Sequence, residues 1–193
     1  MRIEINDMFL KYSLKKEVTL KDNTKCIIRC LCKNDAKEYI KCHLNVLENT
    51  NFCTYYPEEL ITDVDKIEKY LDEEYNNMYL LKLGAFIGDK LVGVTTISPY
   101  GYGLKLQHRA NFSIMVMKEY SNNKVGYNLM KTVLELAKNY AFEVIQLDVV
   151  KENTTAIKLY KSFGFKEYGI FEKYFKNKDG SYSDNILMRL DLR

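Results

Sequence analysis

Hydrophobic and polar residues alternate over residues 108–117, and the pattern changes to a helical one after residue 124. The apolar positions of the first segment are Ala110, Phe112, Ile114 and Val116, and the positions between them are Asn111, Ser113, Met115 and Met117. This period of two predicts a β-strand. The apolar residues of the second segment are Val125, Leu129, Val133, Leu136, Ala137 and Tyr140. Their spacing of three and four predicts an amphipathic helix.

The junction between this strand and this helix has the composition of an anion-binding turn. The sequence NNKVGYN contains Lys124, has no acidic side chain, and places Gly126 where the helix begins. The first amide groups of a helix have no partner within the helix, and the helix dipole is positive at that end. A phosphate could therefore bind here, although an ordinary strand-to-helix connection has the same appearance.

The rest of the chain reads as further strands and helices. Hairpins are predicted at Glu17–Leu20 with Lys25–Leu31, at Met78–Ile87 with Leu91–Ile97, and at Phe165–Phe175 with Tyr182–Leu190. Helices are predicted at 36–48, after a cap at Asn34 or Asp35, and from Asp63 to about Tyr75. A buried strand at Val144–Val150 precedes a helix at Thr154–Phe163, capped by Asn153 and closed by Gly164.

This order, β-α-α-β-β-β-α-β-α-β-β, predicts an α+β fold in which helices flank a mixed, mostly antiparallel sheet. No internal repeat or linker is visible, so residues 1–193 are expected to form one domain, with residues 1–20 as a candidate N-terminal extension.

Composition narrows the class of protein. Hydrophobic residues make up 47% of the 193 residues and aromatic residues 13%, as in a globular domain. A net charge of +3 is too small to indicate nucleic acid as the main partner. The sequence has no apolar run of membrane-spanning length, and its polar N-terminus is unlike a signal peptide, so we expect a cytoplasmic protein. The five cysteines are expected to be reduced, and a zinc site involving Cys42 and His43 is the disfavoured alternative.

Three segments within residues 108–190 resemble the GNAT superfamily of acetyl-CoA-dependent N-acetyltransferases. HRANFSIMVMKEYSNNKVGYNLM resembles the fourth strand and pyrophosphate loop of that family. LDVVKENTTAIKLYKSFGF resembles the fifth strand and the following helix, with the family's N-x-x-A-x-x-L-Y-x-x-x-G-F pattern. GSYSDNILMRL resembles the closing strand of the branch that acetylates amino acids and polyamines. The pyrophosphate loop departs from the usual Q/R-x-x-G-x-G/A, since Ser121, Lys124 and Gly126 stand at its three defining positions.

The resemblance implies an acetyl-CoA site. The backbone of Met115, Val116 and Met117 is expected along the pantetheine arm. The pyrophosphate is expected on the amide groups of Asn122, Asn123, Lys124, Val125, Gly126 and Tyr127. Lys124 replaces a glycine, which costs energy if the backbone needs a positive φ, but it adds a cation beside the phosphates.

The resemblance also implies direct attack of a neutral amine on the acetyl thioester. Tyr160 is the candidate general acid for the leaving thiolate. Asn153 lies two helical turns earlier on nearly the same side, and its amide is a candidate partner of the pantetheine. Asn111 stands where many members have a glutamate base, so His108 is the nearest residue of suitable pKa. Asp148, Glu48 and a chain of water molecules are the alternatives.

The amine acceptor is expected near the loop between the first two helices. The acidic candidates there are Glu48, Glu58, Glu59 and Asp63, and the aromatic candidates are Tyr55, Tyr56, Tyr100 and Tyr102. A small primary amine, such as an amino acid, a polyamine or an antibiotic amine, is the leading acceptor. The alternatives are a protein or peptide amine and a non-catalytic acyl-CoA-binding module, and a homodimer is left open.

Overall fold

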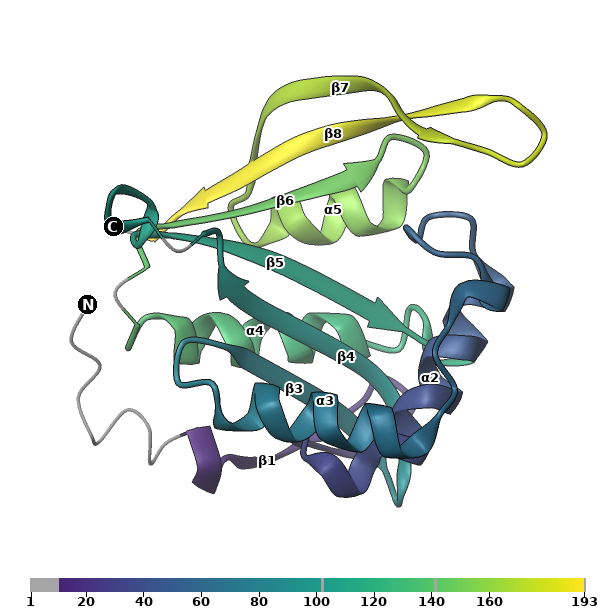
Figure 1. Ribbon diagram of the computed structural model, residues 1–193. Helices are drawn as coiled ribbons and strands as arrows, with labels where there is room; N and C mark the ends of the chain where they lie inside the picture. Colours follow the sequence, from purple (N-terminus) through teal and green to yellow (C-terminus); the bar gives the residue numbers. More distant parts are fainter. Residues whose placement is uncertain (1–10, 102, 141, 193) are drawn as a thin grey trace.

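The computed structural model describes residues 11–101, 103–140 and 142–192, and they form one eight-stranded sheet between two pairs of helices (Figure 1). The strands are β1 (Lys15–Thr19), β2 (Lys25–Cys30), β3 (Leu81–Ile87), β4 (Lys90–Pro99), β5 (Arg109–Val116), β6 (Val144–Val150), β7 (Lys166–Lys176) and β8 (Tyr182–Asp191). The longer helices are α2 (Ala36–Asn49), α3 (Val64–Asn76), α4 (Val125–Ala137) and α5 (Thr154–Ser162). The predicted α+β class and order of elements are confirmed. The predicted order counted the first hairpin as a single β, and the structure has two strands there, β1 and β2.

The strand order β1-β2-β3-β4-β5-β6-β8-β7 places the only parallel pair of this sheet, β5 with β6, near its centre. All other neighbouring strands are antiparallel. The parallel pairing covers Arg109–Asn111 against Val144–Gln146 and goes no further, although both strands continue. β5 and β6 therefore diverge toward their carboxyl ends (Figure 1). A diverging pair leaves backbone groups unpaired, and these are available to a ligand.

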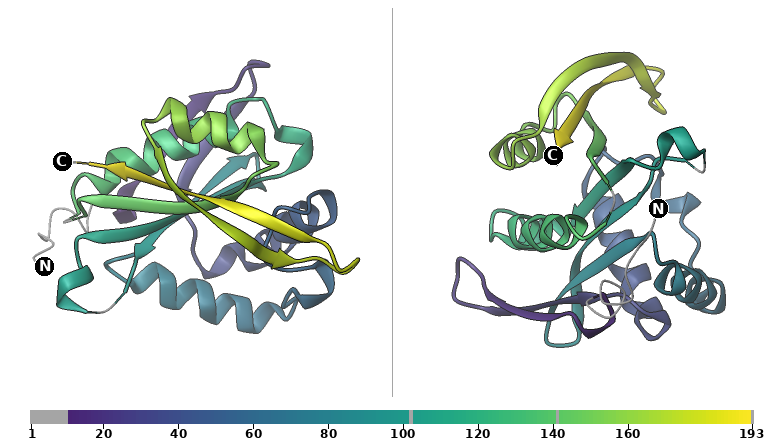
Figure 2. Two further views of the ribbon diagram at one scale, coloured as in Figure 1. Left: turned by 90° about the horizontal axis from the view of Figure 1, so that it is seen from above. Right: turned by 90° about the vertical axis from the view of Figure 1, so that its left-hand side faces the viewer.

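The two pairs of helices cover opposite faces of the sheet (Figure 2). Leu129 and Val133 of α4 and Ile157 of α5 pack in one hydrophobic core with alternate residues of the strands. Tyr39 of α2 and Leu71 of α3 belong to a second, smaller core on the other face. The amphipathic stripes read from the sequence are thus the faces that each helix buries.

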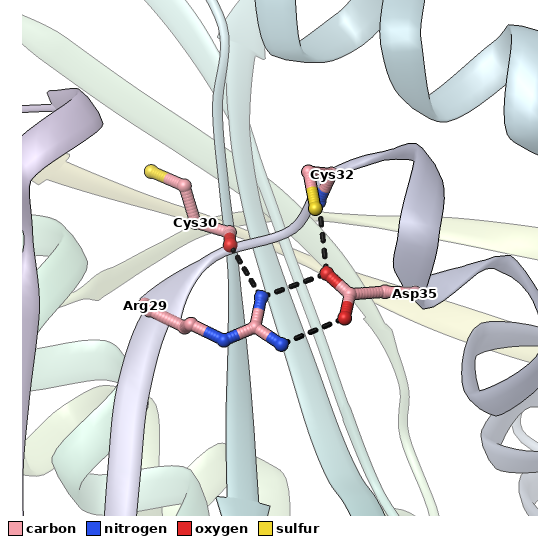
Figure 3. Close-up of polar contacts among 4 residues, drawn as sticks. All are labelled: Arg29, Cys30, Cys32 and Asp35. Carbon is pink, nitrogen blue, oxygen red and sulfur yellow. Dashed lines mark hydrogen bonds and ion pairs between the residues drawn. The ribbon is translucent and has the colours of Figure 1, made fainter. Parts of the chain in front are cut away.

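The beginning of α2 is fixed to β2 by a charged pair (Figure 3). Arg29 donates from both terminal nitrogens to the two carboxylate oxygens of Asp35, each at 2.7 Å, and from Nη1 to the carbonyl of Cys30 at 3.0 Å. Asp35 also accepts from the backbone N of Cys32 at 2.9 Å. Asp35, one of the two expected caps, does stand at the N-cap position of α2, but its carboxylate bonds Arg29 and Cys32 and makes no side-chain cap bond to the helix. Asp63 does cap α3, accepting from Lys66 N at 3.2 Å.

A buried lysine holds α2 and α3 against β3. Only 7% of Lys82 is exposed. Its ammonium donates to the hydroxyl of Tyr70 at 2.7 Å and that of Tyr39 at 3.3 Å, and it forms an ion pair with Glu74. A charge this deep requires such partners. The connection between α2 and α3, which borders the candidate site, therefore starts and ends on fixed helices.

Candidate acetyl-CoA and acceptor site

A cavity of about 740 Å³ connects the beginning of α4 with the middle of α5. Its lining from β5 and the following turn is Ile114, Met115, Val116, Lys118, Tyr120, Ser121, Asn122, Lys124, Gly126 and Tyr127. Its lining from α5 is Asn153, Thr155, Ala156, Lys158, Leu159 and Tyr160, and its lining from α2 and the next loop is Val46, Asn49, Thr50, Phe52 and Cys53. The volume lies in the range of small-molecule sites.

The lining of this cavity favours an anionic ligand. It includes three lysines, Lys118, Lys124 and Lys158, and no aspartate or glutamate among the described residues. The first backbone hydrogen bond of α4 runs from Asn128 N to Lys124 O at 2.9 Å, so the amide groups of residues 125–127 precede it. These amides and the positive end of the dipole of α4 lie at the same place as the lysines. This arrangement fits the phosphates of a coenzyme A molecule.

The phosphate-binding turn uses left-handed backbone at two residues. Asn122 has φ of 61° and Lys124 has φ of 65°. Asparagine adopts this conformation more readily than most residues, whereas lysine does so at a cost. A Cβ atom added to Gly126 would come 3.5 Å from Leu159 and 3.6 Å from Val116, filling space between α4, β5 and α5. The glycine therefore keeps the cavity open.

Two of the residues expected at the pyrophosphate, Asn123 and Val125, do not direct their side chains into the cavity. Asn123 turns away from the cavity, because its Nδ2 donates to Asp22 Oδ2 at 2.8 Å and its Oδ1 accepts from Asp22 N at 3.1 Å. It anchors the turn to the hairpin of β1 and β2. The side chain of Val125 is buried in the core, so only its backbone amide faces the beginning of α4.

The structure also corrects the expected pantetheine contacts. Met117 N donates to Val92 O of β4 at 2.9 Å, and backbone groups of an antiparallel strand point alternately to either side. The backbone N–H and C=O groups of Met115 and Met117 therefore point toward β4. The backbone groups of Ile114 and Val116 point into the gap beside β6. The side chain of Met117 is buried in the second core. Of the three residues expected along the pantetheine arm, only Val116 directs its backbone groups into this gap, together with Ile114.

Asn153 and Tyr160 line the same cavity, as their spacing predicted. Asn153 caps α5, with Oδ1 accepting from Ala156 N at 3.2 Å, which leaves its Nδ2 as a donor. The ring of Tyr160 packs against Phe112 at 5.9 Å and Phe165 at 6.0 Å between ring centroids. Its side chain is 7% exposed, and its hydroxyl has no hydrogen-bond partner among the described residues. Burial, together with the nearby charge of Asp148, raises the pKa of Tyr160 above its ordinary value.

Asp148 is the acidic group whose charge acts on this hydroxyl. It is an exposed residue of β6, and its Oδ2 accepts from Asn185 Nδ2 at 2.8 Å. Asn185 is 1% exposed, and its Oδ1 is buried without a partner among the described residues. Burial and the charge of Asp148 also raise the pKa of Tyr174. The charge of Asp148 thus acts on two phenols, Tyr160 and Tyr174, and its carboxylate is held by the amide of Asn185.

His108 does not reach this position. It is exposed immediately before β5, where its carbonyl accepts from Glu143 N at 2.8 Å, and it lines neither this cavity nor the adjoining one. Phe112, which contacts Tyr160, lies four residues further along the strand, a distance of about 13 Å at the usual rise. His108 therefore lies too far from Tyr160 to act as the expected base. Of the alternatives, Asp148 lines neither cavity but its charge acts on Tyr160, and Glu48 lines the adjoining cavity. An acidic residue in the mostly apolar strand VIQLDVV was the signal for Asp148.

A second cavity of about 610 Å³ adjoins the first and shares Thr50, Phe52 and Cys53 with it. Its other lining residues are Leu47, Glu48, Asn51, Thr54, Tyr55, Tyr56, Pro57, Val150, Glu152, Phe175, Lys176, Asn177, Lys178, Asp179 and Ser183. We call it the acceptor pocket. Three carboxylates line it, those of Glu48, Glu152 and Asp179, whereas the first cavity has none.

The other acceptor candidates have structural partners. Glu58 pairs with Lys178, Glu59 accepts from Tyr56 N at 2.7 Å, and Asp63 is the cap of α3. Arg109 stacks on the ring of Tyr100 at 4.0 Å, and Tyr100 lines neither cavity. Tyr102 lies outside the described residues.

Comparison with known proteins agrees with this fold. Residues 44–165 match the acetyltransferase (GNAT) family model. The structure of a GNAT-family acetyltransferase from Streptococcus pneumoniae superposes with a TM-score of 0.81, covering 86% of this chain and 99% of that one at 24% identity. The structure of yncA, described as a putative acetyltransferase from Salmonella typhimurium with its cofactor acetyl-CoA, gives a TM-score of 0.75 over 87% and 94% of the two chains at 17% identity.

The fold and the family model together define the class of protein: the chain belongs to the GNAT acetyltransferase family. Spermidine N(1)-acetyltransferase of Vibrio cholerae is 26% identical over 84% of this chain and 90% of its own length. Three other curated relatives are matched over only 31%, 50% and 35% of their own lengths.

Proposed function

We propose that this protein transfers the acetyl group of acetyl-CoA to a primary amine of a small molecule by direct attack. The observation that carries the proposal is the single cavity that joins the amide groups at the beginning of α4 to Tyr160. It combines a cationic lining at one end with a buried phenol at the other. Acetyl-CoA would supply the activated acetyl thioester.

The residues of the chain divide the work of this reaction. Amides of Gly126 and Tyr127 with Lys124 would hold the phosphates, and backbone groups of Ile114 and Val116 would orient the pantetheine. Asp148 would accept the proton of the amine, and Tyr160 would donate a proton to the departing sulfur. Once Asp148 is protonated, its charge no longer raises the pKa of Tyr160. The first proton transfer would therefore make the second easier.

The charges of the two cavities favour a cationic acceptor. The first cavity has three lysines and no carboxylate, and the adjoining acceptor pocket has three carboxylates and two lysines, Lys176 and Lys178. Opposite charges in neighbouring cavities would separate an anionic donor from a protonated amine and attract each to its own place. The expected acceptors are therefore small amines with a net positive charge.

Turnover with acetyl-CoA and a panel of amines, followed by thiol release, tests the proposal. Amino acids, diamines, polyamines and amino sugars represent the small acceptors, and short peptides represent the alternative. Release of thiol that depends on one of the small amines is the expected result. Binding of acetyl-CoA by calorimetry without turnover on any amine would instead favour a non-catalytic acyl-CoA-binding module, which the absence of a carboxylate at Asn111 allows.

A further inference from the structure

Two segments that are 120 residues apart meet at one end of the acceptor pocket. One is the loop between α2 and α3, and the other is the turn between β7 and β8. The backbone N of Lys178 donates to the hydroxyl of Tyr56 at 3.1 Å, and its ammonium lies 4.1 Å from the centre of the Tyr56 ring. The same ammonium forms an ion pair with Glu58. We call these three contacts the Tyr56–Lys178 bridge.

Both sides of the bridge are held by their own local bonds. On the loop, Tyr56 N donates to Glu59 Oε2 at 2.7 Å, and Pro57 begins a 3-10 turn. On the hairpin, Asn177 N donates to Ser181 O at 2.8 Å, and Gly180 turns the chain with φ of 84°. The bridge therefore joins two ordered segments and requires little further ordering of either.

The bridge lies at the end of the acceptor pocket away from the first cavity. The two cavities share Thr50, Phe52 and Cys53, and the loop then continues along the acceptor pocket to Tyr56. Tyr56 and Lys178 line the acceptor pocket and not the first cavity, so the bridge bounds part of the space into which an amine reacting in the first cavity would extend. We expect a chain that continues beyond one residue to meet it.

We propose that the Tyr56–Lys178 bridge determines the acceptor class, by closing the pocket around a small free amine and excluding the amino terminus of a peptide. This inference rests on the proposed function, because it concerns the acceptor pocket of that reaction. Tyr56, Glu58 and Lys178 are specificity-determining residues and take no part in the chemistry. The exclusion is steric, and it is lost when the bridge is broken.

The double variant Tyr56→Leu/Glu58→Gln tests the inference, because it removes all three contacts: the hydroxyl that accepts the backbone bond, the ring beside the ammonium and the charge of the ion pair. The matched control is Glu167→Gln, which removes an exposed ion pair with Lys161 of 2.8 Å elsewhere on the surface. The readout is kcat/KM for a small amine and for a tripeptide that carries the same amine at its amino terminus.

The wild-type protein is expected to favour the small amine by at least about tenfold, and the double variant is expected to lower this ratio by about tenfold through faster turnover of the peptide. The control should keep the wild-type ratio. A wild-type preference for the peptide, or an unchanged ratio in the double variant, would overturn this inference and leave the acetyltransferase proposal intact. Absence of turnover with every amine would overturn the proposed function, and this inference with it.

Discussion

Asn185 donates from Nδ2 to Oδ2 of Asp148 at 2.8 Å, which fixes an exposed carboxylate of β6 at the position where its charge reaches Tyr160. We assign the two proton transfers to Asp148 and Tyr160, and this hydrogen bond holds the first of them in place. It depends on the pairing of β6 with β8, where Asp148 lies opposite Leu187 and Asn185 lies opposite Val150.

Replacement of Asp148 by asparagine should lower kcat/KM for the amine about 100-fold, because an amide cannot accept the proton. Binding of acetyl-CoA, measured by calorimetry, should change less than about twofold, since Asp148 does not line the first cavity. Asp65→Asn, an exposed change on α3, is the control. Turnover in D148N within about threefold of the wild type would show that water or another group accepts the proton.

Replacement of Tyr160 by phenylalanine should lower kcat about 100-fold and leave the fold intact. The hydroxyl has no hydrogen-bond partner among the described residues, so the variant loses no internal bond. An unchanged thermal midpoint together with lost turnover would separate the role of proton donor from that of core aromatic. Tyr168→Phe, at a half-exposed tyrosine of β7, should behave as the wild type.

The pH profile gives a second test of Tyr160. Because burial and Asp148 raise its pKa, the phenol stays protonated up to a pH above its ordinary value of about 10. Loss of activity caused by its ionisation should therefore begin only above about pH 10. A fall in kcat near pH 8 that disappears in Y160F would contradict this assignment.

The part of the site that is local in sequence could be predicted from the sequence. The change of period after residue 117, the cap at Asn153 and the left-handed Gly164 each depend on neighbouring residues, and the structure contains all three. The choice between His108 and Asp148 could not be made in this way. It depends on where β5 and β6 diverge and how β8 pairs with β6, which hydrophobic alternation does not encode.

Contacts between segments that are distant in the sequence could not be predicted from it either. The pattern LKLGAFI gives no indication that Lys82 is buried with Tyr70 and Glu74, because its partners are on helices. Likewise, the contact of Asn123 with Asp22 joins residues 101 apart, and the sequence shows no complementarity between them beyond a polar character. Long-range packing decides such contacts.

Two substitutions of Lys124 separate the effect of its backbone strain from the effect of its charge. Lys124→Gln removes the cation beside the phosphates and should weaken acetyl-CoA binding about threefold, with a smaller dependence on salt. Lys124→Gly should also relieve the left-handed backbone and stabilise the fold by about 0.5–1 kcal/mol. Lys131→Gln, on α4 and outside the cavity lining, is the control for charge. Equal binding by K124Q and the wild type would exclude a role for this cation.

Replacement of Asp35 by asparagine should destabilise the protein by about 1–3 kcal/mol at pH 7, measured by urea unfolding. Burial alone would raise the pKa of Asp35, but Arg29 and the Cys32 amide outweigh it, and the pKa is lowered. The stabilisation is therefore complete above the ordinary aspartate pKa of about 3.9 and is lost as the pH falls through the lower folded value. The difference between wild type and D35N should shrink below about pH 4. If the stability difference between wild type and D35N persisted at low pH, it would contradict the charged pair. The control is Asp72→Asn, because Asp72 forms only a loose pair of 3.9 Å with Lys33.

The most direct test of the central claim is a crystal structure of the protein with acetyl-CoA. We expect diphosphate oxygens within hydrogen-bond distance of the amides of Gly126 and Tyr127, and the thioester sulfur within reach of the Tyr160 hydroxyl. A cofactor bound away from the beginning of α4, or a thioester that ends far from Tyr160, would contradict it.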